Sequence, residues 1–148
     1  MKLFLLDKLE YQYVSNQRII DTLESNNMKH GEAHRLISHV LRAQEIWNAR
    51  ILGRGYEGSP WEEYLDEELG AVNASALEES RTILNELDLE STVSYQNSKG
   101  EAYSNTVSEI IYHQVNHGTY HRGQLMKLFA QEGLPTFSTD YIYFKRKR

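Results

Sequence analysis

Three histidines recur at four-residue intervals in the last third of the chain, at His113, His117 and His121. Residues four apart lie on one face of an α-helix, so two neighbouring imidazoles of this set can bind a single metal ion. His113 and His121 are separated by roughly 12 Å of helix rise, whereas zinc binds a histidine nitrogen at about 2.0 to 2.1 Å. The spacing therefore restricts a metal site to His113 with His117 or to His117 with His121.

The apolar residues of this segment select one of the two pairs. At about 100° per residue they form a stripe roughly 100° wide, the face of an amphipathic helix that packs into a core. His117 and His121 fall inside this stripe, and His113 falls at its margin. Since a buried imidazole without a partner is costly, the inner two are either metal ligands or core histidines hydrogen-bonded to buried groups such as Gln114 or Asn16. The stripe consists of Val107, Ile110, Ile111, Leu125, Leu128 and Phe129.

Three other histidines precede this segment. A second amphipathic helix is predicted over about residues 32–52. His39 lies on the flank of its apolar stripe and can approach the core of a bundle, whereas His34 falls on the opposite face and is expected to meet solvent. His30 and His34 are also four residues apart, but His30 lies in the connecting segment, so we expect no metal site there.

Hydrophobic periodicity predicts an all-α fold, a four-helix bundle with a short β-hairpin before the last long helix. The first three helices are expected over about residues 3–23, 32–52 and 71–87. Val93 and Tyr95 then alternate with polar residues, and residues 97–100 have the composition of a turn, which together indicate the hairpin.

Local signals set the limits of the remaining segments. A capping box of Thr106 and Glu109 marks the start of the last helix, and Gly133 marks its end. Residues 53–70 are predicted to form a long connection with one short helical turn, in which the acidic run is a solvated face. The tail, residues 137–144, has alternating aromatic side chains and is predicted to pack along the bundle as an extended segment.

Composition limits the classes of function. The 148 residues are expected to form a single domain, residues 1–148, because this length buries a sufficient core without disulfides or metal staples. A net charge of −5 disfavours nucleic acid as a partner. The chain has no cysteine, which excludes thiolate metal ligands and a cysteine nucleophile. We see no secretion signal and no membrane span, so a cytoplasmic location is expected.

The histidine helix and the segment around His39 resemble the DinB/YfiT-like family of bacterial four-helix-bundle metalloproteins. Residues 116–125, NHGTYHRGQL, are similar to the fourth-helix signature of that family. Residues 39–50, HVLRAQEIWNAR, resemble its second-helix histidine followed by Trp and Arg, and residues 139–144, TDYIYF, resemble its closing segment. The order and spacing of these three stretches carry the resemblance over nearly the whole chain.

The resemblance implies a metal site of three histidines, one from the second helix and two from the fourth. Carried over to this sequence, they are His39, His117 and His121, holding a divalent ion with open coordination positions. Zinc or nickel is expected, with iron, cobalt or manganese as alternatives. Asp140 is a candidate fourth ligand, although the closing segment of the family accounts for it equally well.

The resemblance leaves three functions open. The first is an enzyme, a transferase or isomerase that uses a low-molecular-weight thiol on a small-molecule substrate. The second is a hydrolase in which the metal activates water, and the third is a stress protein that binds metal without catalysis. Open coordination favours the two enzymes, because structural zinc is usually closed by four protein ligands. A homodimer is also expected, through apolar surface that includes Trp61, Tyr64 and the tyrosine-rich tail.

Overall fold

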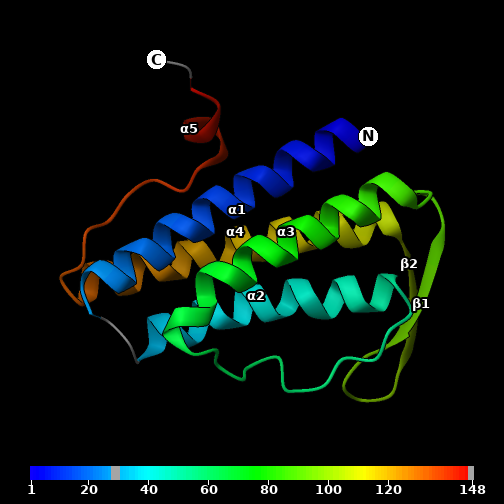
Figure 1. Ribbon diagram of the computed structural model, residues 1–148, viewed down its shortest axis with the longest axis horizontal. Coiled ribbons are helices and arrows are strands. Elements are labelled where there is room, and N and C mark those ends of the chain that lie inside the picture. The colour runs from blue at the N-terminus through cyan, green and yellow to red at the C-terminus, as the bar shows by residue number, and fades with distance from the viewer. Residues whose placement is uncertain (28–30, 147–148) are drawn as a thin grey trace.

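Four long helices form a bundle, and a two-stranded hairpin crosses one end of it (Figure 1). The computed structural model describes residues 1–27 and 31–146, so His30 and its pairing with His34 lie outside the described residues. None of the described helices combines the length and apolar character that a membrane crossing needs. The elements are α1 (Lys2–Ser25), α2 (Glu32–Ile51), η1 (Asp66–Glu68), α3 (Leu69–Glu86), β1 (Thr92–Gln96), β2 (Ala102–Thr106), α4 (Val107–Gln131) and α5 (Tyr141–Lys145).

The predicted four-helix bundle with a hairpin before the last long helix is confirmed. Helix α2 packs against α3 and α4, and α1 packs against the same two helices. The apolar core divides into two clusters, one toward the hairpin and one toward the opposite end. Between them each long helix contributes buried polar side chains: Gln12, Asn16, Gln44, Asn48, Asn73, Ser80, Gln114 and Arg122.

Hydrogen bonds between helices link members of this polar belt. The Nε2 of Gln114 donates to Oδ1 of Asn48 at 2.9 Å. The guanidinium of Arg122 is fully buried and donates to Oδ1 of Asn16 at 3.1 Å. Because buried polar groups need such partners, the belt fixes how the helices are aligned. Gln114 and Asn16, considered as partners for core histidines, are engaged in the belt instead.

The start of α4 follows the prediction closely. Thr106 Oγ1 accepts a hydrogen bond from the backbone N–H of Glu109 at 3.2 Å, and the Glu109 carboxylate accepts one from the Thr106 N–H at 2.9 Å. Both halves of the capping box are therefore present. Since β2 ends at Thr106 and α4 begins at the next residue, the strand continues into the helix without a connecting loop.

The C-terminal tail differs from the prediction of an extended segment over residues 137–144. That prediction is wrong beyond Asp140, where the chain forms the short helix α5. The aromatic rings that matter are three apart, Tyr141 and Phe144, and both contact Tyr11 of α1, at 5.4 and 5.9 Å between ring centroids. Tyr141 also donates a hydrogen bond to the carboxylate of Asp7. A helical turn presents both rings to α1, which an extended strand with alternating faces would not do.

The prediction that His34 faces solvent is also wrong. Its side chain is 3% exposed, with Nδ1 2.8 Å from the Glu63 carboxylate and Nε2 2.9 Å from that of Asp66. Both acids belong to the long connection after α2, which returns along the outer face of this helix. The helical phase of α2 identifies the face turned to the bundle, but it contains no information about a connection that covers the opposite face.

Candidate metal centre

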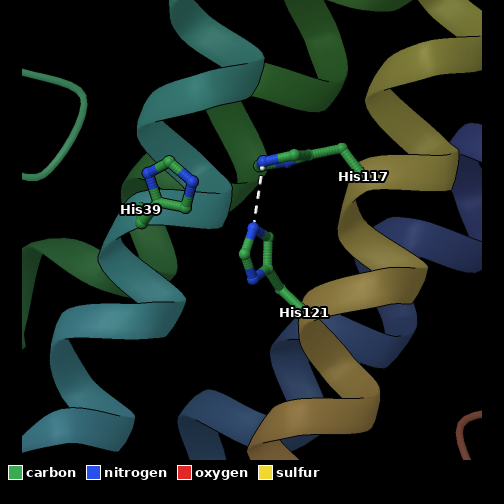
Figure 2. A group of neighbouring side chains, drawn as sticks. All are labelled: His39, His117 and His121. Carbon is green, nitrogen blue, oxygen red and sulfur yellow. Dashed lines mark hydrogen bonds between the residues drawn. The ribbon is translucent and has the colours of Figure 1, made fainter.

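His39 of α2 and the pair His117 and His121 of α4 come together in the bundle (Figure 2). One ring nitrogen from each residue lies within 4.8 Å of the others. Among the described residues no other histidine, aspartate or glutamate joins this group. The three histidines selected from the sequence therefore gather in one place, where they could hold a metal ion.

The spacing of the α4 pair suits a shared ion. The Nε2 atoms of His117 and His121 are 3.1 Å apart. Two nitrogens at the zinc–histidine bond length of about 2.0 to 2.1 Å are separated by roughly 3.3 Å in tetrahedral geometry and roughly 2.9 Å in octahedral geometry. The observed separation lies between these values, so one ion can bind both atoms with little movement of either ring.

Hydrogen bonds outside the group fix the proton on two of the three rings. His39 Nδ1 donates to the backbone carbonyl of Pro60 at 2.7 Å, and His121 Nδ1 donates to Oε1 of Gln124 at 2.6 Å. Because an oxygen at each Nδ1 can only accept, the opposite nitrogen, Nε2, carries the lone pair. Ligating histidines are typically held in this way, with the second nitrogen donating to a carbonyl or another oxygen. The donor set therefore fits a metal ion.

Burial favours the neutral form that a metal requires for two of the histidines, His39 and His117. The pKa of His39 is lowered mainly because burial removes its ring from water. The pKa of His117 falls to about 3, because its ring is buried and because His121, His39 and His113 would repel its positive charge. A neutral imidazole is the form that binds metal, so near neutral pH protons do not compete for these two nitrogens.

Trp61 covers the outer side of the group. Its indole stacks on the His39 imidazole with ring centroids 3.7 Å apart and planes inclined by 4°. The Arg35 guanidinium also lies near the indole, 5.2 Å from the ring. The sequence indicated Trp61 only as apolar surface, because a residue in a long aperiodic connection has no helical phase that could place it. The Pro60 carbonyl was missed for the same reason.

Two other candidates from the sequence lie outside the group. The ring of His113 is 5.8 Å from that of His117 and 5.2 Å from that of Trp47, so it is a neighbour of the group and not a member. Asp140 precedes α5, where its carboxylate accepts a hydrogen bond from Ser138. Asp140 therefore does not join the three histidines as a fourth ligand.

A cleft of about 550 Å³ opens beside the histidines, along the seam between α2 and α4. His121 forms part of its wall, so a small molecule in the cleft can reach the group. The cleft combines apolar walls with two cationic side chains. The residues that define its character are Arg35, Leu36, Trp61, Tyr120, His121 and Lys127.

Comparison with known proteins places the chain in a family. A profile described as DinB family matches residues 20–148, a range that includes all three histidines. The chain belongs to the DinB family. This DinB-family protein is 28% identical over 151 residues to Protein DinB of Bacillus subtilis (strain 168), and the alignment covers 89% of this chain and 88% of that protein. No solved structure matches it. The family resemblance seen in the sequence is thereby confirmed.

Proposed function

We propose that the protein binds one divalent metal ion through His39, His117 and His121 and uses it to catalyse a reaction of a small molecule with a low-molecular-weight thiol. The observation that carries this proposal is the three-histidine group, in which His39 and His121 have Nε2 lone pairs fixed by oxygen acceptors. The adjoining cleft supports an enzyme, because a substrate can enter beside His121.

The number of ligands supports a reactive metal site. Structural zinc sites usually have four protein ligands, whereas catalytic sites keep a position open. The described residues supply three ligands and no fourth. Three imidazoles suit zinc or nickel, and iron, cobalt or manganese are alternatives.

The chemistry of the chain itself favours an external thiol. When bound, an ion with three neutral imidazoles keeps its double positive charge and lowers the pKa of a thiol or water in its open position. The chain has no cysteine, so the sulfur nucleophile must come from a cosubstrate. The protein residues then hold and orient the reactants, and Trp61 limits access of water on the outer side.

Metal-dependent hydrolysis is the alternative enzyme function. It needs a general base within hydrogen-bonding reach of the attacking water. Glu32 is the one carboxylate among the residues that line the cleft, and none of the described acids belongs to the histidine group. A stress protein that binds metal without catalysis is the third candidate, and the cleft beside His121 makes it the weakest.

We also propose that the protein is cytoplasmic, and that it forms a homodimer, as the family resemblance implies for the latter. Exposed apolar side chains support self-association: Trp61 is 45% exposed and Ile142 of α5 is 57% exposed. Sedimentation equilibrium at tens of micromolar should give twice the chain mass of 17.3 kDa. A single species at the chain mass would contradict the dimer.

The proposed function is tested with protein loaded separately with zinc, nickel and cobalt. Each form is assayed with bacterial thiols against halogenated and epoxide electrophiles, and in parallel with a panel of hydrolase substrates. Thiol consumption above the rate of the metal-free protein and of His117→Ala supports the proposal. Metal-dependent hydrolysis with no thiol reaction would replace it with the alternative, and the absence of both would leave a binding protein.

A further inference from the structure

We propose that the cleft beside His121 is a carboxylate-selecting site, in which Arg35 and Lys127 bind the carboxylate of a small substrate whose other end lies at the three histidines. This inference rests on the proposed function, since it names the substrate class for the same site. The occupant is a monoanionic molecule with an apolar portion between its carboxylate and its reacting atom.

The two cations lie on the same side of the histidine group. Arg35 is one helical turn before His39 on α2, and Lys127 is six residues after His121 on α4, or roughly 9 Å of helix rise. Because the two helices run antiparallel, these opposite sequence directions lead to the same end of the seam (Figure 1). Both side chains line the one cleft that also contains His121. A ligand with about 9 Å between its two ends can therefore span from the histidines to the cations.

Neither of these two side chains is held by a carboxylate of the described residues. Over residues 1–27 and 31–146, neither Arg35 nor Lys127 forms an ion pair with a carboxylate. The partner of Arg35 is the face of Trp61. By contrast, Arg54 and Arg81 both pair with glutamates. The cleft is thus lined by two positively charged hydrogen-bond donors.

The balance of charge in the cleft favours a monoanion. Glu32 lines the same cleft as the two cations, which leaves a single positive charge in excess. A carboxylate matches that excess and can accept two parallel bonds from a guanidinium, whereas a dianionic phosphate would exceed it. Outside the cleft the net charge of −5 repels anions, so selectivity for an acid requires a local site of this kind.

Part of the cleft wall is apolar. Leu36 of α2, Leu128 of α4 and the indole of Trp61 line the same cleft as the cations and His121. A hydrocarbon or aromatic spacer fits these walls, since burial of apolar area is favourable and a polar spacer would lose its water. The expected substrate therefore carries its carboxylate at a distance from its reactive atom.

The test compares two thiols that differ only in their terminal group. Mercaptohexanoate and mercaptohexanol are titrated into cobalt-loaded full-length protein, and the thiolate-to-cobalt absorption band reports sulfur at the metal. We expect the acid to bind about tenfold more tightly than the alcohol, since a charged hydrogen bond typically contributes that factor or more. The ratio should fall to about one in Lys127→Gln and in Arg35→Gln, and it should be unchanged in Lys99→Gln in the hairpin turn. Equal affinities in the native protein, or a ratio insensitive to both variants, would overturn the inference while leaving the thiol function in place.

A second titration separates this inference from the proposed function. Hexanoate, hexanol and inorganic phosphate are titrated into the zinc-loaded protein while tryptophan fluorescence is recorded, because Trp61 lines the cleft. Saturable binding of hexanoate that Lys127→Gln abolishes supports the carboxylate site even if neither thiol reaches the metal. Tighter binding of phosphate than of hexanoate, or equal binding of hexanoate and hexanol, would overturn it. Circular dichroism of each variant establishes that the fold is retained.

Discussion

The imidazole of His39 lies flat against the indole of Trp61, with 3.7 Å between the ring centroids. The residue before Trp61 holds the same imidazole from its edge, because the Pro60 carbonyl accepts the hydrogen of His39 Nδ1. A candidate metal ligand of α2 is therefore packed and oriented by the connection that follows this helix. Because the two rings are in direct contact, a movement of the Trp61 indole also affects the His39 imidazole.

This contact predicts an optical signal of metal binding. Addition of nickel or cobalt should quench the fluorescence of Trp61, because its ring stacks directly on a proposed ligand. Trp61→Phe should remove most of the change. Trp47→Phe is the matched control and should retain it, since Trp47 contacts His113 and not the three proposed ligands. Equal quenching in both variants would show that the ion binds elsewhere.

The ligand assignment predicts the metal content of histidine variants. Wild-type protein should contain one ion per chain by mass spectrometry of the metal, and His39→Ala, His117→Ala and His121→Ala should each lose most of it. His113→Ala should keep full stoichiometry, since its ring lies outside the group. Full metal content in any of the first three would contradict the assignment.

Gln124 should tune the affinity for metal without binding the ion. Its amide oxygen accepts from His121 Nδ1 at 2.6 Å, and removal of such a partner typically reduces metal affinity about 10- to 100-fold. Gln124→Leu should therefore weaken binding by that factor in a competition assay with a chelating dye. Gln131→Leu, further along the same cleft wall, is the control and should leave the affinity unchanged.

Burial of the histidines predicts how the stability of the metal-free protein depends on pH. The pKa of His39 is lowered and that of His117 falls to about 3, whereas histidine in an unfolded chain titrates near pH 6.5. The unfolded chain thus binds more protons below about pH 6.5, so the stabilisation is complete above that pH and is lost as the pH falls toward 3. The free energy of unfolding in urea should decrease by up to about 1.4 kcal/mol per pH unit for each histidine. His117→Gln should make this decrease shallower between pH 7 and 5, and an identical slope would contradict the prediction.

Two glycines of α4 should respond in opposite directions to alanine. A Cβ at Gly118 would lie 2.5 Å from Gln12 Oε1 and 2.8 Å from Arg122 Nη1, both in the polar belt. Gly118→Ala should therefore destabilise the protein by about 1 to 3 kcal/mol. A Cβ at Gly123 meets nothing within 4 Å, so Gly123→Ala should stabilise the helix by up to about 1 kcal/mol. Thermal unfolding of the two variants measures both effects. Unchanged stability of Gly118→Ala would contradict the clash, and destabilisation by Gly123→Ala would contradict the open space at that position.

The parts that sequence reasoning predicted are those with a strong local signal. The apolar phase of α4 separated His117 and His121 from His113, and the capping box placed the first residue of that helix. His39 could be related to the other two only through family resemblance, because no pattern within α2 states which helix it faces. Helical periodicity describes one element at a time, whereas a metal site joins several.

The parts that it missed depend on contacts distant in sequence. His34 is covered by Glu63 and Asp66, which lie about 30 residues later in an aperiodic connection. Trp61 reaches His39 from that same connection. Tyr141 folds into a helical turn because Tyr11, at the other end of the chain, receives its ring. In each case the deciding interaction is tertiary, and no local propensity records it.

The direct passage from β2 into α4 limits where this chain can change in length. One residue inserted between Thr106 and His117 would turn the two histidines of α4 by about 100° around the helix axis, away from His39. Residues added at the hairpin tip around Gly100, or in the connection before Ser59, would not rotate these histidines. Insertions and deletions that preserve the histidine group are therefore confined to the loops. The segment from Thr106 to His121 must keep its length.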